Sequence, residues 1–232
     1  MSYQTKIHSL HALATSSLKN KKILITCGPT WVSLDSVRVI SNQSSGQLGH
    51  ILARDLHKAG ARVTVLEGPV QTPLTVKGIK VLKFSFFDEL FALLKKELSQ
   101  KYTAVIHAAA VADYQPAKKF SGKIDSDLAK MQITLVRTPK LINIIKAIRP
   151  KIFLTGFKLE PRIDKNKLKK ITKKLFKNAH CNLVVANSLN KKNYSGYIVN
   201  NRLQVLAKVG SRQKLSQRLV EILKEKICTD FP

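Results

Sequence analysis

The stretch GQLGHILARDLHKAGARVTVLEG, residues 46–68, decides the fold, because a helix pattern there passes directly into a strand pattern. Apolar residues first recur at helical spacing, and Gly60 ends that pattern. The predicted buried face of this helix holds Leu48, Ile51, Leu52 and Leu56. The β-branched run at 61–68 then has the composition of a buried parallel strand, as does KKILITCG at 21–28. Strand, helix and strand together predict a right-handed βαβ unit.

The rest of the chain continues this alternation. Strands are predicted at residues 81–86, 103–113, 151–157 and 181–187, with helices at 87–98 and between the last two strands. Two alternating runs meet at Asn200 and Asn201, which predicts a late antiparallel hairpin. A closing amphipathic helix begins after Ser211, its predicted N-cap. The predicted fold class is α/β: one doubly wound, mostly parallel, Rossmann-like sheet with a late antiparallel hairpin.

Two segments depart from the alternation. Residues 114–136 are rich in Pro, Gly and Lys at their start and are interpreted as an excursion or flap. Residues 1–20 lack the apolar region and cleavage site of a signal peptide, so we expect a leader arm or helix there. We expect residues 21–232 to form a single nucleotide-binding domain.

Composition limits the class of protein. The 232 residues carry a formal net charge of +27, but lysines dominate it and are spread along helices and loops. Aromatic residues do not interleave with them, so we interpret the charge as a solvated surface and expect no specific nucleic-acid partner. No apolar run is long enough for a transmembrane helix, so we expect no membrane partner. Cys27, Cys181 and Cys228 show no metal or disulfide spacing, which favours a reducing cytoplasm.

Small and polar residues follow the first predicted strand, where ligands bind in such folds. Gly28 permits a sharp turn there. Ser44, Ser45, Gly46 and Gly49 stand at a helix N-terminus, where free N–H groups and the helix dipole favour an anion. The alternative is that the glycines only help packing and the serines only cap the helix. The spacing of Gly28 and Gly46 does not fit the dinucleotide fingerprint.

Other candidates come from neighbouring loops. Arg38 offers a planar fork for a carboxylate or phosphate, and Asn42 can orient an acyl group or an amine. Both residues can equally serve to stabilise the loop. The backbone of Ala109 and Ala110 is expected to approach a ligand in the crevice. Asp113 is the only acid there and could instead cap a helix.

Three lysines are also candidates. Lys123, on the predicted flap, could neutralise phosphate charge during a reaction. Lys173 and Lys177 are one helical turn apart and share a face, which by itself is typical of a solvated surface.

Taken together, the motifs resemble one family. The stretches GPTWVSLDSVRVISNQSSGQLG, AAAVADYQP, GKID, TGFKLE and KNAHCNLVVAN occur in the order found in phosphopantothenoylcysteine synthetases, also called phosphopantothenate–cysteine ligases, of coenzyme A biosynthesis. The resemblance runs from about residue 21 to the C-terminus. In many bacteria this enzyme is the C-terminal half of a bifunctional flavoprotein. No decarboxylase domain precedes it here, so we expect a stand-alone synthetase without flavin and a separate phosphopantothenoylcysteine decarboxylase.

The resemblance implies a two-step ligation of 4'-phosphopantothenate and L-cysteine. The substrate carboxylate attacks the α-phosphate of CTP, pyrophosphate leaves and an acyl-cytidylate forms, with Mg²⁺ shielding charge. The cysteine amine then attacks the acyl carbon and CMP departs. Positioned cations and helix-end amides suit such chemistry.

The resemblance also implies residue roles. Asn42 matches the asparagine needed for the intermediate to proceed, and Lys123 matches the flap lysine needed to form it. Arg38 matches an arginine that reaches phosphopantothenate bound by the partner subunit, which implies a homodimer. Positions that cradle nucleotide phosphates match Gly28, Ser44, Gly46 and Gly49. Residues lining the substrate and nucleotide crevice match Ala109, Ala110 and Asp113. Further nucleotide contacts match Pro139, Lys140, Leu141, Ile142, Phe157, Lys173, Lys177 and Asn187.

The chain departs from the family pattern at three places. Trp31, Val32 and Ser33 replace a common Arg-Glu-Pro, and Asp125 and Ser126 replace two flap lysines. Lys158 and Leu159 stand where many members have two alanines, which makes the nucleotide preference less secure than the reaction type.

Two alternatives remain open at this stage. A dinucleotide-dependent reductase could use the same fold, although its fingerprint is missing and Glu67 is the only acid near the ribose position. A basic nucleic-acid-binding protein would exploit the net charge, and would show a steep salt dependence.

Overall fold

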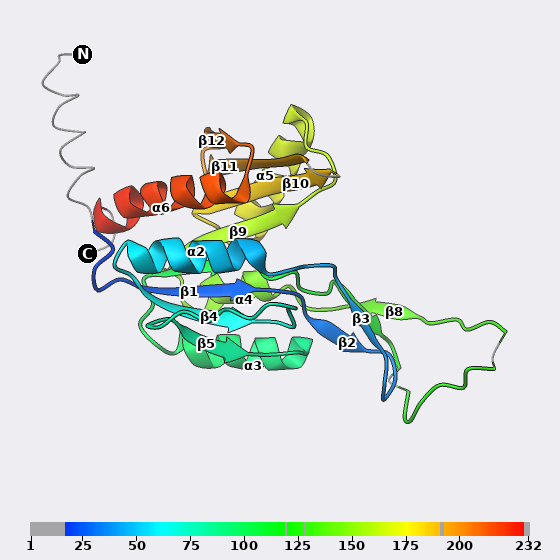
Figure 1. The fold of residues 1–232 in the computed structure, drawn as a ribbon. Helices are drawn as coiled ribbons and strands as arrows, with labels where there is room; N and C mark the ends of the chain where they lie inside the picture. The colour runs from blue at the N-terminus through cyan, green and yellow to red at the C-terminus, as the bar shows by residue number, and fades with distance from the viewer. Residues whose placement is uncertain (1–16, 119, 128, 191–192, 230–232) are drawn as a thin grey trace, which may run out of the picture.

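A computed structural model describes residues 17–118, 120–127, 129–190 and 193–229 (Figure 1). Most of the predicted leader, residues 1–16, lies outside this part of the chain. Residues 17–20 are described, and Leu18 is fully buried in the core, with its N–H donating to the carbonyl oxygen of Ala59 at 3.2 Å. The packed domain therefore includes Leu18, a few residues before the expected boundary.

The centre of the molecule is an eight-stranded sheet with the order β12-β11-β10-β9-β6-β1-β4-β5 (Figure 1). Its parallel strands are β1 (Lys22–Cys27), β4 (Arg62–Glu67), β5 (Lys80–Lys83), β6 (Ala104–His107), β9 (Phe153–Leu159) and β10 (Leu183–Asn190). The antiparallel strands are β11 (Asn193–Asn200) and β12 (Val205–Val209). This topology confirms the predicted fold class.

Helices cover both faces of the sheet (Figure 1). One layer holds α2 (Gln47–Lys58) and α6 (Arg212–Thr229), and the other holds α3 (Phe87–Leu98), α4 (Leu141–Ile148) and α5 (Lys165–Ala179). Strand β1 is buried from its second residue to its last, because both of its faces lie under a helix layer. That double burial explains why the strand is a continuous apolar run instead of an alternating one. None of the helices in the described residues is long and apolar enough to cross a membrane.

The buried face of α2 differs from the predicted one. It consists of Gly49, His50, Leu52, Ala53 and Leu56, whereas Leu48 and Ile51 are only half-buried. The helix is rotated because Gly49 has no side chain and lets the helix backbone approach β1 closely. A histidine is thereby turned into the interior, which hydropathy alone could not predict.

The late hairpin is confirmed, and a second one precedes it. The β11–β12 loop holds residues 201–204, and the Asn200 side chain accepts hydrogen bonds from the N–H groups of Arg202 and Gln204, both at 3.0 Å. The run predicted at 181–187 continues to Asn190 and pairs antiparallel with β11. This pairing could not be predicted from the sequence, because no Gly or Pro marks the turn between the two strands.

An arm projects from the carboxyl ends of the parallel strands (Figure 1). We use the name arm for residues 31–41 and 114–137. The first part is a hairpin of β2 (Trp31–Ser33) and β3 (Val39–Ser41), and the second is a ribbon of β7 (Tyr114–Pro116) and β8 (Leu135–Arg137). This ribbon forms the base of the predicted flap. The hairpin was expected to be a plain loop, because its strands are too short to produce an alternating pattern.

Candidate active site

The candidate site lies at the topological switch point of the sheet, on either side of which successive strands are added in opposite directions from β1. After β1, the chain adds β4 and β5 on one side and then crosses to β6 on the other. Ligands bind at such switch points in doubly wound sheets. Here the Ala110 N–H donates to the Gly28 carbonyl oxygen at 2.9 Å, which brings the ends of β1 and β6 together.

Two glycines shape the floor of the site. Gly28 and Gly46 have φ values of 78° and 69°, which favour glycine. A Cβ on Gly28 would lie 3.0 Å from the backbone nitrogen of Gly68, and one on Gly46 would lie 2.8 Å from Cγ1 of Val70. Gly46 is the N-cap of α2 and has no side chain to cap it. First-turn N–H groups of this helix are therefore available to an anion.

The other residues of that motif have more ordinary roles. A Cβ on Gly49 would lie 2.2 Å from Cβ of Cys27, so the packing of α2 against β1 accounts for this glycine. Ser45 Oγ accepts a hydrogen bond from the Gln47 N–H at 3.4 Å, which is the capping alternative. Ser44 is half-buried at the entrance to the helix.

Asn42 connects the two sides of the switch point. Its side-chain nitrogen donates to the carbonyl oxygens of Ala110 and Val111, both at 3.1 Å. These bonds hold the β3–α2 segment against the turn that follows β6. No hydrogen bond to the side-chain oxygen occurs among the described residues, so its acceptor capacity is unused there.

Threonines form the scaffold behind this turn, and the sequence analysis missed them. Thr26 Oγ1 lies 2.9 Å from Nδ1 of buried His107, and the Ala109 N–H donates to Thr26 Oγ1 at 3.3 Å. Thr30 Oγ1 accepts from the Ala112 N–H at 2.9 Å, and Thr138 Oγ1 donates to the Ala112 carbonyl oxygen at 2.6 Å. Burial lowers the pKa of His107 to about 4, so the imidazole is neutral at pH 7. The only sequence signal would have been a threonine at the end of a buried strand.

Asp113 forms an exposed ion pair with Lys140. It caps no helix within the described part of the chain, so that alternative is wrong. Lys140 directly precedes α4, and the Thr138 N–H donates to the Asp113 carbonyl oxygen at 3.1 Å. The structure therefore brings the 139–142 segment beside the turn that carries Asp113.

Several of the further nucleotide contacts predicted from the family resemblance lie near the carboxyl ends of neighbouring strands. Phe157 is half-buried near the end of β9, and Asn187 lies near the end of β10, where its carbonyl oxygen accepts from the Glu160 N–H at 2.9 Å. Ile142 of α4 packs over β9, since a Cβ on Gly156 would lie 2.8 Å from its Cδ1. Lys173 and Lys177 are exposed on α5. Phe157 and Asn187 therefore lie near the carboxyl ends of neighbouring strands with Ile142 packed against β9, whereas the two α5 lysines are exposed.

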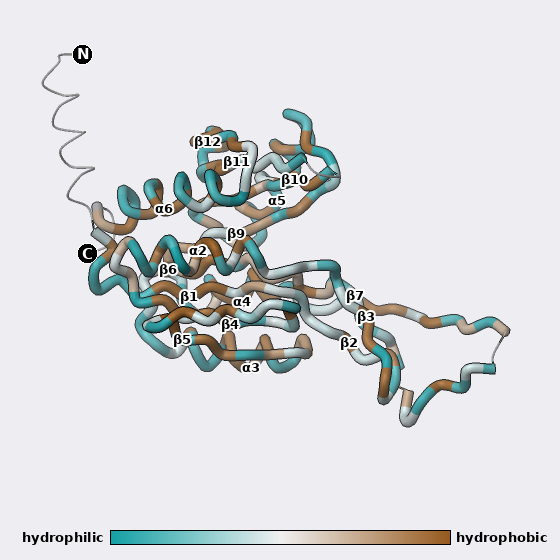
Figure 2. The backbone as a smooth tube through the Cα atoms, in the orientation of Figure 1, coloured by the Kyte–Doolittle hydropathy of each residue, from teal (hydrophilic) through white to brown (hydrophobic). Residues whose placement is uncertain are grey.

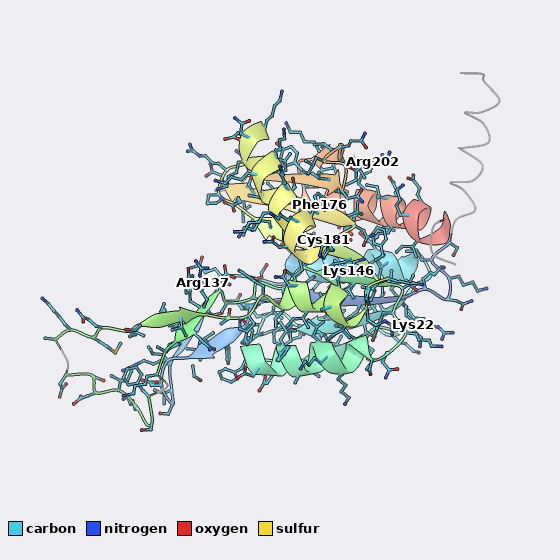
Figure 3. The ribbon with its side chains drawn as sticks, turned by 180° about the vertical axis from the view of Figure 1, so that it is seen from behind. Lys22, Arg137, Lys146, Phe176, Cys181 and Arg202 are labelled. Carbon is cyan, nitrogen blue, oxygen red and sulfur yellow. The ribbon has the colours of Figure 1, made fainter. Side chains whose placement is uncertain are left out.

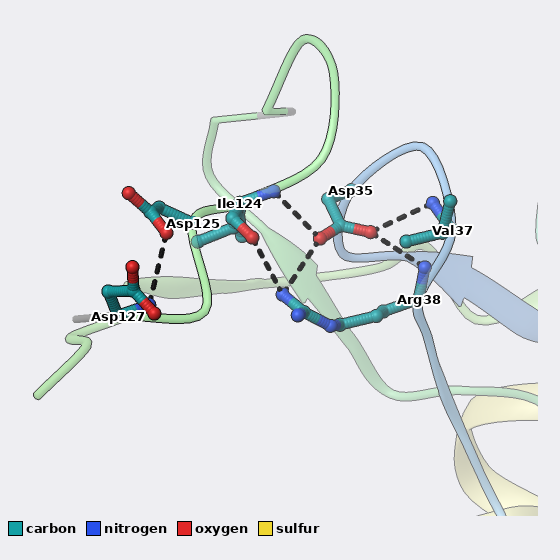
Figure 4. Close-up of polar contacts among 6 residues, drawn as sticks. All are labelled: Asp35, Val37, Arg38, Ile124, Asp125 and Asp127. Carbon is teal, nitrogen blue, oxygen red and sulfur yellow. Dashed lines mark hydrogen bonds and ion pairs between the residues drawn. The ribbon is translucent and has the colours of Figure 1, made fainter. Parts of the chain in front are cut away.

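Arg38 and Lys123 belong to the arm instead of the strand ends. The Asp35 carboxylate accepts from the N–H groups of Val37, at 2.9 Å, and Ile124, at 3.1 Å, while Arg38 Nη1 donates to it at 3.1 Å and to the Ile124 carbonyl oxygen at 3.3 Å (Figure 4). Burial acts to raise the pKa of Asp35, but these hydrogen bonds and the Arg38 charge together hold it below the usual range. The contacts fix the flap segment next to Lys123.

Glu67, the acid that a dinucleotide-dependent reductase could have used to bind a ribose, is not available for that role. Its carboxylate is 1% exposed, and Oε1 accepts from the Leu74 N–H at 2.9 Å and lies 2.7 Å from Nε2 of His50. Burial, with the nearby Glu67 charge as a second cause, raises the pKa of the Cys27 thiol beside them. The one acid that a dinucleotide-binding reductase could have used is therefore committed elsewhere.

An open hollow of about 520 Å³ lies at the other end of the sheet, away from these residues. Asn182, Asn201 and Arg218 contribute to its lining, and none of the predicted site residues does. The arm beside the candidate site projects away from the body (Figure 1).

A doubly wound, mostly parallel sheet covered by helices on both faces, with a glycine and a helix N-terminus at its switch point, defines an α/β protein of the Rossmann-like class. The chain belongs to the family described as DNA/pantothenate metabolism flavoprotein C-terminal domain, which matches residues 18–230. This confirms the resemblance seen in the motifs.

Relatives and solved structures agree with this assignment. The coenzyme A biosynthesis bifunctional protein CoaBC of Thermococcus kodakarensis is 33% identical over 181 residues, covering 78% of this chain and 44% of that protein. Its counterpart in Borreliella burgdorferi is 34% identical over 211 residues, covering 90% and 52%. The chain thus spans about half the length of these relatives. The DNA/pantothenate metabolism flavoprotein of Streptococcus pneumoniae has a TM-score of 0.80 at 26% identity, covering 88% of this chain and 99% of its own.

A more distant structure shares the fold. A Cab2 mutant, H337A, in complex with phosphopantothenate-cysteine, superimposes with a TM-score of 0.73 at 18% identity, covering 98% of this chain and 95% of its own.

Proposed function

We propose that this chain is a phosphopantothenate–cysteine ligase of coenzyme A biosynthesis. The observation that carries the proposal is that three features meet at one switch point: the neighbouring glycines Gly28 and Gly46, the Asn42 amide and the Ala110 backbone. An anion site next to a positioned amide suits an acid that is activated as an acyl-phosphate and then captured by an amine. The bifunctional coenzyme A relatives and the Cab2 complex with phosphopantothenate-cysteine support the same chemistry.

The proposed reaction has two steps. The carboxylate oxygen of 4'-phosphopantothenate attacks the α-phosphorus of CTP, and the bond to pyrophosphate breaks. The cysteine amine then attacks the acyl carbon, loses a proton, and CMP leaves. We assign the α2 N-terminus at Gly46 to the nucleotide phosphates and Lys123 to the charge that develops in the first step. Asn42, with its free side-chain oxygen, orients the acyl group or the incoming amine in the second step.

Mg²⁺ would enter with the nucleotide. The ion keeps most of its coordination on phosphate oxygens and water and needs few protein carboxylates. The site fits this requirement, because Asp113 is the single carboxylate of the turn after β6 and half of its surface is exposed. When bound, Mg²⁺ would neutralise part of the phosphate charge, while Lys140 beside Asp113 adds a second cation at the same place.

The arm provides a surface for a second copy of the chain. It carries exposed apolar side chains, visible as brown stretches along the arm in Figure 2. Those side chains are Val37, Val39, Tyr114, Phe120, Met131, Leu135 and Val136. Arg38 uses one terminal nitrogen to bind within its own arm, and its guanidinium has further N–H donors. We propose a homodimer in which Arg38 reaches phosphopantothenate in the partner's site.

The division of labour between Asn42 and Lys123 tests the proposal. With CTP, Mg²⁺ and 4'-phosphopantothenate, Asn42→Ala should still release pyrophosphate but accumulate the acyl-cytidylate after cysteine is added. Lys123→Gln should stop before pyrophosphate release, because the developing phosphate charge is no longer neutralised. Pyrophosphate and CMP are measured separately in a quenched-flow assay.

Each variant has a matched control in the chain. Gln43→Ala removes the exposed neighbour of Asn42, and Lys118→Gln removes another exposed flap lysine. Both controls should behave as the wild type does. Equal loss of pyrophosphate release in Asn42→Ala and Lys123→Gln would refute the assigned roles.

A further inference from the structure

Three buried side chains from three different elements lie close together beside Gly28 and Gly46. Cys27 ends β1, His50 lies in the first turn of α2, and Glu67 ends β4. Their sulfur, nitrogen and oxygen atoms all lie within 4.8 Å of one another. The sequence shows no metal-ligand spacing here, because the three residues are far apart in the chain and meet only through the fold.

The geometry of His50 is not that of a simple hydrogen-bonded pair. Its Nε2 lies 2.7 Å from Oε1 of Glu67, yet this buried nitrogen has no hydrogen-bond partner among the described residues. At so short a distance, the missing bond means that the ring N–H direction does not point at the oxygen. A buried polar nitrogen without a partner is costly, so this nitrogen calls for a further ligand.

From this geometry we infer a zinc site formed by Cys27 Sγ, His50 Nε2 and a Glu67 carboxylate oxygen. Thiolate, imidazole and carboxylate are the three protein ligands that Zn²⁺ uses, and three of them leave one tetrahedral position for water. A thiolate in the set disfavours Mg²⁺ and Ca²⁺, which prefer oxygen ligands. The site is distinct from the Mg²⁺ that accompanies the nucleotide.

Neighbouring groups support this assignment. Gly46 and Gly49 lie directly against the buried cluster: a Cβ on Gly46 would lie 3.4 Å from His50 Nε2, and one on Gly49 would lie 3.1 Å from Cys27 Sγ. The Leu74 N–H holds the Glu67 carboxylate in place as an outer-shell donor. Bound zinc would tie together the ends of β1 and β4 and the start of α2, the elements that form the anion-binding turn. The inference does not depend on the proposed ligase activity.

Co²⁺ and Zn²⁺ binding to the full chain, prepared without a polyhistidine tag and stripped with a chelator, tests the site. We expect one Zn²⁺ per chain by elemental analysis. We also expect Co²⁺ to produce a thiolate-to-cobalt charge-transfer band that added Zn²⁺ removes. Cys27→Ala should lose the band. His50→Gln and Glu67→Gln should each weaken Co²⁺ binding by more than the about 10- to 100-fold that an outer-shell partner costs.

Cys181→Ala is the matched control. Cys181 is also a buried cysteine, but it lies in the other helix layer, beside Lys146 and Phe176 (Figure 3). This variant should keep both the band and the Zn²⁺ content. A wild-type chain without the band, a band that survives in Cys27→Ala, or a band lost equally in Cys181→Ala would overturn the site. If Cys27→Ala misfolds, the wild-type Co²⁺ spectrum and the Co²⁺ affinities of His50→Gln and Glu67→Gln still test the site.

Discussion

Gly49→Ala should destabilise the chain, because one methyl group would force α2 away from β1. The new Cβ would lie 2.2 Å from Cβ of Cys27, whereas carbon atoms in contact are about 3.5 Å or more apart. Cys27 Cβ is fixed by the backbone of a central strand and cannot rotate away, so the helix must shift by about 1 Å or more. Alanine in a helix interior is otherwise about 1 kcal/mol better than glycine.

Because backbone atoms must move, the overpacking cost should lie at the upper end of its range, about 2–3 kcal/mol. The offset of about 1 kcal/mol from the helix preference for alanine leaves an expected net loss of about 1–2 kcal/mol. Urea unfolding followed by circular dichroism measures it. Gly210→Ala is the control, because a Cβ there meets nothing within 4 Å, and it should change the free energy of unfolding by less than about 0.5 kcal/mol. The shift of α2 should also carry Gly46 away from Gly28 and reduce pyrophosphate release. A Gly49→Ala variant as stable and as active as the wild type would refute this packing argument.

Three further predictions concern pH and the arm. Burial lowers the pKa of His107 to about 4 in the folded chain, whereas the unfolded chain takes up a proton at this residue below about pH 6.5. The free energy of unfolding should therefore be highest above that pH and fall by about 2 kcal/mol by pH 5. Urea unfolding at pH 7 and pH 5 should show this loss in the wild type and not in His107→Gln. Ionised Asp35 stabilises the arm at every pH above the normal pKa of an aspartate, and this stabilisation is lost as the pH falls through the lowered pKa of the folded chain. Proteolysis of the flap should therefore accelerate below about pH 4. Asp35→Asn should be cleaved at the faster rate already at pH 7, and a rate equal to that of the wild type at pH 7 would contradict this. Replacing exposed Leu135 and Val136 of the arm by serine should shift a dimer toward monomer in sedimentation velocity. Val205→Ser should not, because Val205 is an exposed apolar residue of β12, an edge strand of the central sheet outside the arm.

Much of the fold could be predicted because its strands are buried on both faces and its helices are amphipathic. The helix predicted at 87–98 coincides with α3, and the predicted Ser211 cap is confirmed by the Lys214 N–H, which donates to its Oγ at 3.1 Å. The rotation of α2 could not be predicted, since it depends on how closely Gly49 approaches Cys27 in another element. The short strands of the arm were missed because three residues are too few to show a period.

The candidate site was predictable only in part. Gly28 and Ala110 come together because they follow β1 and β6, which are neighbouring parallel strands of the central sheet. Asn42 follows β3 of the arm and joins them through its hydrogen bond to the Ala110 carbonyl oxygen. The contacts between Arg38 and the flap were not predictable, since they join residues far apart in the chain through backbone groups that no sequence pattern marks. The Cys27–His50–Glu67 cluster was missed for the same reason.

Pyrophosphate release by the purified chain tests the central claim most directly. The chain is mixed with Mg²⁺ and CTP, with and without 4'-phosphopantothenate, and cysteine is added afterwards; ATP replaces CTP in a parallel series. We predict that pyrophosphate release requires 4'-phosphopantothenate, that CMP appears only after cysteine is added, and that CTP is preferred. Absence of release with either nucleotide, or release that is indifferent to 4'-phosphopantothenate, would contradict the proposed ligase.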